Sequence, residues 1–415
     1  MKKIKIGIFG CGPRGLWLAK EFALLKDCEV VAVCDDRAER EKMALEAFGK
    51  DCRFFSNFDE FIEYDLDAVL LANLFYDHAQ YAIKCLDRNI HVLSECISCG
   101  TMAEGVQLVK AARKSRAIYM LLENYPQMIV NRDMQRVVAG GTLGKILYAE
   151  GEYNHPFNPT DTDFTKEYQY HLQHWRNFLP RTYYITHSLA PLMRATGATP
   201  KTVSALCAFA PPSEDVATAS HVGDKAAIIT TMNDDGSIFR VTGCSAFGAH
   251  HNAYRICGTN GQIENLRGMG EKIMLRYNDW QIPEGKEEIN LYDAVIDDPD
   301  EELIRASAHG GGDYVTLRMF TEYIKENRSP EHPFNVDSAV AMASCAILGH
   351  RSMLEGGKPY EIPDFNDDEW CKLYENDYLT PFYGVNGEEP TLPCCSKTDY
   401  KPTDKQIEKY LNSLK

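Results

Sequence analysis

The sequence predicts a two-domain α/β protein, in which a domain on a parallel sheet precedes an α+β domain on a large, mostly antiparallel open sheet. With 415 residues the chain is longer than a single hydrophobic core usually grows, so two domains are expected. Roughly the first 120 residues alternate short β-branched runs with helical patterns, which is typical of βαβ units. From about Gly144 onward, longer strand-like runs separated by turns replace this alternation.

In the N-terminal part, apolar runs predict five strands, and two of the stretches between them carry apolar residues at helical spacing. The predicted strands are 4–10, 30–35, 68–72, 91–94 and 118–122, and the predicted helices are 16–25 and 103–113. We place this domain at residues 1–125.

In the C-terminal part, turn sequences at 233–236 and 259–261 predict hairpins. The predicted strands are 145–153, 202–209, 226–232, 238–245 and 255–258, followed by helices at 312–326 and 336–355. We place the second domain at residues 126–362 and an acidic, aromatic C-terminal extension at 363–415.

Charge and cysteine usage limit the class of protein. The 44 basic and 60 acidic residues give a net charge of -16, which repels a phosphate backbone, so we expect no nucleic-acid partner. No apolar run reaches the roughly 18 residues of a membrane span, and the N-terminus enters a strand without a signal-peptide pattern. The 14 cysteines are scattered through presumed core segments. We therefore expect a soluble, cytoplasmic protein without a membrane partner.

The sequence gives little sign of a metal site. Residues 96–99 form a single C-x2-C, and the pair 394–395 has no second ligand pair at finger spacing. The neighbours His250 and His251 have no carboxylate at metal-ligand spacing. We expect no bound metal.

Residues 10–15 read G-x-G-x-x-G between a predicted strand and a predicted helix, the setting of a dinucleotide-binding loop. In such a loop the pyrophosphate lies at the helix N-terminus, where free N–H groups favour an anion. Asp35 follows Gly15 by 20 residues at a strand end, where its carboxylate can bind the ribose hydroxyls. The negative charge of Asp35 favours NAD over NADP, because it would repel the 2′-phosphate of NADP. Arg37 nearby could still allow NADP to bind. The predicted cofactor contacts here are Gly10, Gly12, Pro13, Arg14, Gly15 and Asp35.

A Rossmann domain of this length before an antiparallel one, with the segments 67–72 and 89–95, resembles the glucose-fructose oxidoreductase, inositol dehydrogenase and related (Gfo/Idh/MocA) family over roughly residues 4–363. That family usually reads K-H-V-x-x-E-K-P at the second segment. Here Cys96 replaces the lysine that ordinary members use beside the nicotinamide and substrate. We expect Asn73, His78 and Glu95 on the cofactor side, with Glu95 at the nicotinamide ribose or the substrate.

Three further segments resemble one branch of this family, the NAD-dependent glycosidases typified by α-N-acetylgalactosaminidase, which also lack the lysine. They read L-E-N-Y at 122–125, Y-I-T-H-S-L-A-P at 184–191 and H-G-G-G-D-Y at 309–314. The chain departs from that branch at Ile185, where proline is common, and at Gly312, where methionine is common. The resemblance implies a cofactor that is used but not consumed.

Such chemistry needs proton donors and acceptors. Transient oxidation at carbon 3 acidifies the C–H at carbon 2, so a base can remove that proton while the aglycone leaves; water addition and reduction complete the hydrolysis. Tyr184 and His187 have suitable chemistry for this proton transfer, and either of them can be the base. We expect Pro191 in the first turn of the helix that follows. His309, beside a glycine run, is the third catalytic candidate.

The remaining predictions concern the substrate. Glu123 and Asn124 follow the fifth predicted strand, so we expect them at the sugar and at the nicotinamide edge, with loop stabilisation as the alternative. Asp313 reads equally as a helix cap. The predicted substrate contacts are Glu123, Trp175, Arg176, Tyr183 and Asp313.

Two other functions remain open at this stage. One is a net sugar or inositol dehydrogenase in which Tyr184 or His187 replaces the missing lysine; the other is a non-catalytic NAD(H)-binding sensor. The resemblance also implies a homodimer or tetramer formed through the open face of the second sheet, and a small carbohydrate as substrate.

Overall fold

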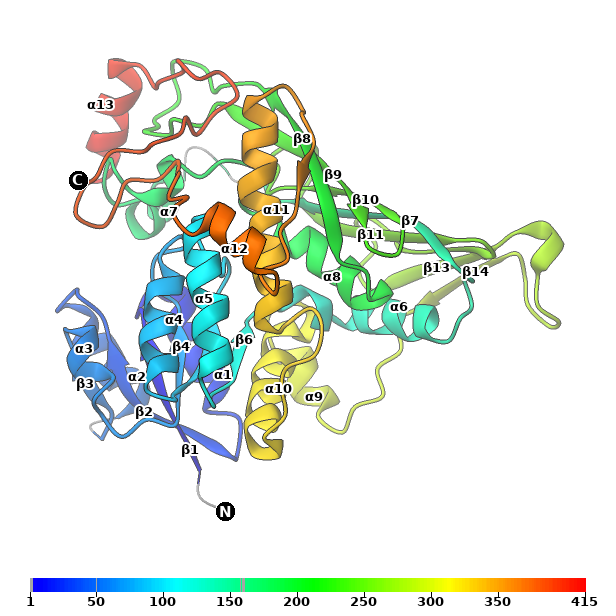
Figure 1. Cartoon of the computed structure of the whole chain (residues 1–415), viewed down its shortest axis with the longest axis horizontal. Helices are drawn as coiled ribbons and strands as arrows, with labels where there is room; N and C mark the ends of the chain where they lie inside the picture. The colour runs from blue at the N-terminus through cyan, green and yellow to red at the C-terminus, as the bar shows by residue number, and fades with distance from the viewer. Residues whose placement is uncertain (1–2, 50, 157, 159–160) are drawn as a thin grey trace.

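The computed structural model describes residues 3–49, 51–156, 158 and 161–415. Six parallel strands form the N-terminal sheet in the order β3-β2-β1-β4-β5-β6 (Figure 1). They are β1 (Ile4–Phe9), β2 (Cys28–Cys34), β3 (Arg53–Phe55), β4 (Ala68–Leu71), β5 (His91–Ser94) and β6 (Tyr119–Leu121). The strand order reverses between β1 and β4, which is where open parallel sheets bind ligands. The predicted Rossmann domain is confirmed; only the three-residue β3 escaped prediction, because it is too short to show a period.

Helices connect these strands: α1 (Pro13–Phe22), α2 (Arg40–Phe48), α3 (Phe58–Phe61), α4 (His78–Asp87) and α5 (Met102–Lys114). The predicted helix 16–25 in fact begins at Pro13, because proline suits the first helical position, where its missing N–H costs nothing. A capping box between Thr101 and Glu104 starts α5 at almost the predicted residue.

Nine strands form the C-terminal sheet in the order β14-β13-β12-β11-β7-β10-β9-β8-β15. They are β7 (Ile146–Asn154), β8 (Pro200–Phe209), β9 (Asp224–Asn233), β10 (Ile238–Thr242), β11 (His251–Gly258), β12 (Gly261–Asn265), β13 (Lys272–Tyr277), β14 (Ile289–Asp293) and β15 (Tyr360–Glu361). Neighbours pair antiparallel except β7 and β10, which are parallel, so the predicted sheet and both hairpins are confirmed. The predicted strand 238–245 ends earlier, because the carbonyl of Arg181 approaches Gly243 so closely that only glycine fits.

The helices of this part are α6 (Ile129–Ala139), α7 (Thr162–Tyr168), α8 (Thr186–Thr196), α9 (Glu301–Ala306), α10 (Gly312–Glu326), α11 (Val336–Leu354), α12 (Asp368–Tyr374) and α13 (Asp404–Ser413), with 3-10 turns η1 (Tyr125–Gln127), η2 (Trp175–Asn177), η3 (Asp279–Gln281) and η4 (His309–Gly311). The predicted helices 312–326 and 336–355 are confirmed, the second ending one residue early. Because α10 packs on α1 while α11 packs on both α5 and β8, these two helices join the domains.

The C-terminal extension crosses both domains. It first covers α5, where Ala103 N–H donates to the carbonyl of Asp377, and Phe382 then stacks on Tyr76 in the loop after β4. It returns to the second sheet and ends as α13 beside α7 (Figure 1). The last strand of the first sheet ends at Leu121 and the first strand of the second begins at Ile146, so the predicted boundary near 125 lies between the two sheets and stays a prediction.

Three features bear on the predicted class. All 14 cysteines are unpaired thiols. Among the described helices, none has the length and apolar character needed to cross a membrane. Within the described part of the chain, His, Cys, Asp and Glu side chains nowhere gather in a group of three or more that could hold a metal ion.

Candidate active site

A cavity of about 620 Å³ opens between the two domains. Arg14, Glu95 and Asn124 of the Rossmann domain line one side of it. The C-terminal domain supplies the other walls. Among its lining residues are Tyr153, Arg176, Arg181, Tyr184, His187, Lys225, His309 and Tyr410. The cavity thus adjoins the carboxyl ends of the parallel strands, the place expected for a ligand.

The glycine loop between β1 and α1 has the shape of a dinucleotide cradle. Gly10 has a φ of 95°, and a Cβ there would lie 2.4 Å from the carbonyl oxygen of Ala72. A Cβ on Gly15 would lie 1.9 Å from the carbonyl oxygen of Gly10, whereas one on Gly12 would meet open space. No side chain caps the N-terminus of α1. The loop is therefore packed tightly on one side and leaves backbone N–H groups free on the other, which fits a pyrophosphate.

Asp35 stands beside this loop, directly after β2. Its carboxylate accepts hydrogen bonds from the N–H of Cys11 at 2.6 Å and of Arg37 at 3.0 Å. Burial raises the pKa of Asp35, although these two bonds oppose the rise. The guanidinium of Arg37 is paired with Glu39, so it is not free for a 2′-phosphate. The arrangement fits NAD.

Asn73 and His78, both predicted at the cofactor, differ in their surroundings. The side-chain oxygen of Asn73, after β4, is buried and has no hydrogen-bond partner among the described residues, so it is available to a ligand. His78 does not line the cavity. Its Nδ1 lies 2.9 Å from the carbonyl oxygen of Ile97, and burial lowers its pKa. His78 thus positions the loop after β5, while its Nε2, which is buried without a partner among the described residues, keeps the direct cofactor contact a prediction.

A network centred on Asp313 joins the domains at the cavity. Arg14 donates to both oxygens of Asp313, at 2.8 and 2.9 Å, and to Glu95 at 2.6 Å. Asn124 and Nδ1 of His309 donate to the same carboxylate, at 2.7 and 2.9 Å. Burial alone would raise the pKa of Asp313, but the bond from His309 and the charge of Arg14 hold it well below its usual range. Asp313 therefore orients three side chains and does not cap α10.

His309 lies on the left-handed turn that precedes α10. Its φ is 53°, and those of the next two glycines are 57° and 86°. Gly312 lies so close to Asn124 that a Cβ would be 2.3 Å from the carbonyl oxygen of that residue. This contact explains why glycine replaces the methionine of the similar branch here. The turn holds the imidazole at the cavity with about 40% of its side chain exposed.

His187 forms a second pair with a carboxylate. Its Nδ1 lies 2.8 Å from Oε1 of Glu123, whose side chain is fully buried. Burial alone would raise the pKa of Glu123, but the charge of His187 and its hydrogen bond lower it. Tyr125 stacks on the imidazole with ring centres 4.1 Å apart. Because Nδ1 faces the carboxylate, Nε2, which forms no hydrogen bond within the described chain, is left for a ligand.

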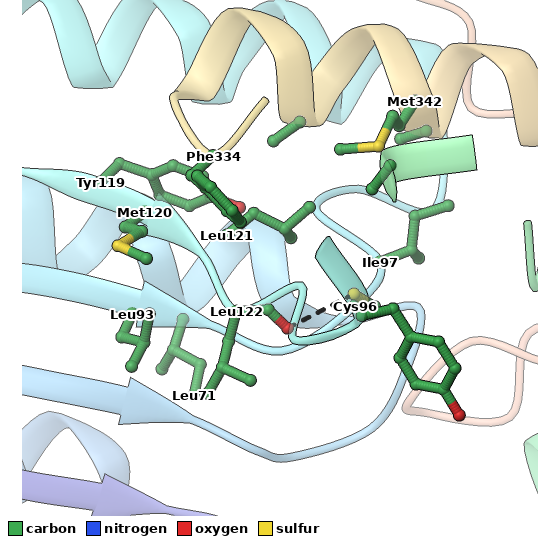
Figure 2. Packing of buried hydrophobic residues seen from close by; sticks show 14 of the residues in the cluster. Leu71, Leu93, Cys96, Ile97, Tyr119, Met120, Leu121, Leu122, Phe334 and Met342 are labelled. Carbon is green, nitrogen blue, oxygen red and sulfur yellow. Dashed lines mark hydrogen bonds between the residues drawn. The ribbon is translucent and has the colours of Figure 1, made fainter. Parts of the chain in front are cut away.

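Cys96, in the place of the family's lysine, belongs to the same group. Figure 2 shows its side chain just beyond the strand ends, with the sulfur directed toward the carbonyl oxygen of Leu122. The sulfur also lies 3.1 Å from Oε2 of Glu123. Burial and the neighbouring Glu123 raise the pKa of the thiol well above its usual range, so it stays neutral. The chain thus has a neutral donor at this position.

Helix α8 begins at Thr186, so Pro191 lies in the helix interior and not in its first turn as predicted. A proline there cannot donate to the carbonyl of His187, four residues earlier. The hydroxyl of Tyr254 on β11 donates to that carbonyl instead, at 2.7 Å. This bond satisfies the backbone of His187 and ties it to the second sheet.

Tyr184 stands beside His187, with ring centres 5.2 Å apart, and stacks between Phe75 and Tyr153. A neighbouring cation such as Arg176 lowers the pKa of a tyrosine hydroxyl. The structure shows the opposite direction: burial raises the pKa of Tyr184 and outweighs Arg176. Tyr184 is therefore a neutral hydroxyl in this site.

Two predicted substrate contacts are corrected. Tyr183 is fully buried and packs edge-on against Phe382 and His350, away from the cavity. Trp175 does not line the cavity either, because its ring is stacked on Phe75 at 5.0 Å and contacts the guanidinium of Arg176. Aromatic residues in a sequence do not reveal which rings are already covered.

Several cavity residues were not predicted. Tyr125 directly follows the L-E-N segment, so its position was a usable signal. Tyr153, Arg181, Lys225 and Tyr410 lie in separate segments without a motif, and only the fold brings them to one cavity.

Comparisons with known proteins agree with this arrangement. Residues 4–123 match the oxidoreductase family with an NAD-binding Rossmann fold, and residues 214–372 match the C-terminal domain of glycosyl hydrolase 109. A glycosyl hydrolase family 109 protein of Streptomyces coelicolor is 23% identical, covering 88% of this chain and 84% of that protein. Glycosyl hydrolase family 109 protein 2 of Akkermansia muciniphila is 24% identical, covering 89% and 84%.

Solved structures show the same fold. Levoglucosan dehydrogenase in complex with NADH and levoglucosan superposes with a TM-score of 0.70 at 15% identity, covering 88% of this chain and all of that one. Myo-inositol 2-dehydrogenase from Lactobacillus plantarum gives 0.66 at 16% identity, with 87% and full coverage. The chain is an NAD-dependent enzyme in which a Rossmann domain that matches the Gfo/Idh/MocA oxidoreductases precedes a domain that matches the C-terminal domain of glycosyl hydrolase 109.

Proposed function

We propose that the protein cleaves a glycosidic bond in a sugar substrate by a redox-neutral, NAD-dependent reaction. The observation that carries the proposal is the pair of histidine–carboxylate couples, His187–Glu123 and His309–Asp313, on the walls of one cavity. Relatives named as glycosyl hydrolase family 109 proteins support the reaction class.

Bound NAD supplies reversible hydride transfer at carbon 3 of the sugar. Gly10, Gly12 and Gly15 would cradle its pyrophosphate, Asp35 would hold the adenosine ribose, and the unpartnered side-chain oxygen of Asn73 would accept a hydrogen bond from the cofactor. Arg14 joins this side of the cavity to Asp313, and would thereby fix the position of the cofactor relative to the sugar.

The residues of the chain move the protons. Nε2 of His187 takes the proton from carbon 2, and Glu123 stabilises the imidazolium that forms. Protonated His309, oriented by Asp313, gives a proton to the leaving oxygen. The neutral hydroxyl of Tyr184 donates a hydrogen bond to the oxygen at carbon 3. Buried Cys96 keeps Glu123 in place and adds no charge, which distinguishes this site from one with a lysine.

The test is a panel of nitrophenyl glycosides incubated with the purified protein and NAD+, with nitrophenol and NADH absorbance followed together. We expect nitrophenol release without net NADH formation, and loss of that release in His187→Gln and Tyr184→Phe. The matched control is His251→Gln, because His251 forms a 2.9 Å pair with Glu152 outside the cavity lining. Stoichiometric NADH without nitrophenol would show a dehydrogenase, and NAD binding with neither signal would show a sensor.

We also propose that the protein works in the cytoplasm as a homo-oligomer. The 14 unpaired thiols suit a reducing compartment. Large apolar side chains such as Leu206 and Leu291 are more than half exposed on one face of the second sheet. Such a face is typical of a protein interface. Light scattering after gel filtration tests the oligomer, and Leu206→Asp is expected to shift it toward monomer.

A further inference from the structure

The outer wall of the cavity carries positive charge that no described residue neutralises. Arg176, Arg181 and Lys225 line this wall, whereas the protein as a whole has a net charge of -16. Of the described residues that line the cavity, Glu95 is the only acid, and it is paired with Arg14. Acids normally accompany buried cations, so this concentration of one sign requires an explanation.

Each of the three cations lacks a carboxylate partner in the described chain. Arg181 donates from Nε to the carbonyl of Asp224 and from Nη1 to that of Cys244, so it is fixed to the second sheet. The guanidinium of Arg176 lies over the rings of Trp175 and Tyr168, at 4.3 and 5.7 Å. Lys225 on β9 has neither an ion pair nor a hydrogen bond from its ammonium group within that part of the chain.

Two acids in the segments beside this wall already have other partners. The carboxylate of Asp224 accepts hydrogen bonds from the backbone N–H of Ser396 at 2.8 Å and from its hydroxyl. Asp215 is exposed and pairs with Lys405 and Lys409 of α13. Burial and the neighbouring Arg181 lower the pKa of Lys225, as expected for uncompensated positive charge.

The cofactor does not account for these charges. Its pyrophosphate belongs at the N-terminus of α1 in the first domain, whereas Arg181 and Lys225 are held by the loop before α8 and by β9 of the second. A wall of fixed cations that faces a sugar site in an acidic protein selects a ligand with an anionic group.

We infer that the sugar substrate carries an anionic substituent, a carboxylate or a phosphate, which is bound between Lys225, Arg176 and Arg181. This inference rests on the proposed function for the sugar site and names the class of sugar that the site takes. Guanidinium groups pair with carboxylate and phosphate oxygens through two parallel hydrogen bonds, and the lysine adds a point charge. Neutral glycosides leave all three cations desolvated and unpaired, so they bind less well.

The experiment is equilibrium calorimetry on the full chain saturated with NADH. The probes are D-glucuronate, D-galacturonate and D-glucose 6-phosphate, compared with D-glucose and D-galactose. These free sugars sample both anomers, so the anomeric preference of the site does not decide the result. We expect at least one anionic sugar to bind roughly 10-fold to 100-fold more tightly than its neutral parent. The uronates and the phosphate separate the two kinds of anion.

The variants Lys225→Gln and Arg176→Gln should abolish that preference while NADH affinity and the melting temperature stay near those of the parent. Lys286→Gln, which removes an exposed lysine between β13 and β14, should keep the preference. Equal or weaker binding of every anionic sugar overturns the inference, and so does a preference that survives in the double variant Arg176→Gln/Lys225→Gln. Loss of NADH binding in both variants also overturns it, because the cations would then serve the cofactor.

Binding is measured without any bond cleavage, so this result is separable from the proposed reaction. An anionic preference in a protein that releases no nitrophenol would contradict the proposed function and leave the anionic subsite standing.

Discussion

The two histidine–carboxylate pairs of the cavity are alike in contact distance and differ in everything around them. Glu123 is fully buried and serves His187, with Tyr125 stacked on the ring and Tyr254 holding its carbonyl. Asp313 is equally buried, but its histidine is about 40% exposed on a left-handed glycine turn. The first pair is held rigidly by packing, and the second lies at the mouth of the cavity.

The two carboxylates also differ in their other hydrogen-bond partners. Besides the imidazole, Glu123 accepts the thiol of Cys96, a nearby backbone N–H and the side chain of Thr186, whereas Asp313 accepts from Arg14 and Asn124 of the other domain. The comparison teaches that both carboxylates bridge the domains, Glu123 through a histidine held rigidly by packing, and Asp313 through Arg14 and Asn124 while it also orients an exposed histidine. The following predictions test that difference.

The largest effect is expected from Glu123→Gln. The amide leaves the shape of the site intact but cannot stabilise the imidazolium of His187, so kcat should fall about 100-fold to 10,000-fold. Steady-state nitrophenol release measures it, and the melting temperature reports folding. Glu152→Gln, in the pair that lies outside the cavity lining, is the control. A near-normal kcat in Glu123→Gln would contradict the role given to this pair, because His187 would then not depend on its carboxylate.

Asp313→Asn should act mainly on stability. Arg14 would keep only Glu95, and losing its bonds to Asp313 should cost about 1.5–3 kcal/mol, because a third of the Arg14 side chain is exposed to solvent. Because the folded pKa of Asp313 lies below the unfolded value, its contribution is present above about pH 4 and is lost as the pH falls through the folded pKa. Melting temperatures between pH 6 and pH 2.5 should therefore fall less steeply in the variant than in the parent. Parallel curves would show that Asp313 does not join the domains.

His309→Gln is expected to cost less than the change at Glu123. An exposed imidazole at the cavity mouth can be replaced in part by water, so kcat should fall roughly 10-fold to 100-fold. With a substrate whose leaving group needs no proton, such as a dinitrophenyl glycoside, this substitution should leave kcat nearly unchanged. An equal loss with good and poor leaving groups would remove His309 from the role of acid.

The smallest effect concerns the support of His187. Tyr254→Phe leaves the His187 carbonyl without a donor, at a cost of about 1–3 kcal/mol in stability. Pro191→Ala supplies a backbone N–H that can donate to the His187 carbonyl. Tyr254→Phe should therefore lower the stability less in a protein that already carries Pro191→Ala. A double-mutant cycle by chemical denaturation measures the coupling, and additive effects would show that the hydroxyl does not replace the missing helical bond.

Patterns in the sequence predicted the domain order, most strands and the dinucleotide loop, because these depend on local period and on glycines at fixed spacing. They also brought Tyr184, His187 and His309 forward as candidates. The partner of His187 was placed with the substrate instead, since Glu123 is 64 residues away and only the fold brings them together. The buried Tyr183 and the covered Trp175 were misassigned, because composition does not show which ring faces are free.

The cationic wall was beyond sequence reasoning for a similar reason. Arg181 and Lys225 sit in segments without a motif, and whether a cation has a partner depends on side chains from other elements. Arg176 was predicted as a substrate contact, but the sequence does not show that its guanidinium lacks a carboxylate partner.

The path of the C-terminal extension has one more consequence. Tyr410 of α13 lines the cavity, and its hydroxyl donates to the carbonyl of Gln169 next to α7. Neither His187 nor the glycine loop contacts this helix in any described hydrogen bond. Insertions or substitutions in the last dozen residues can therefore enlarge or narrow the room for the group attached to the sugar while the proton-transfer residues stay as they are, which makes this terminal helix the natural place for relatives to diverge in what they accept.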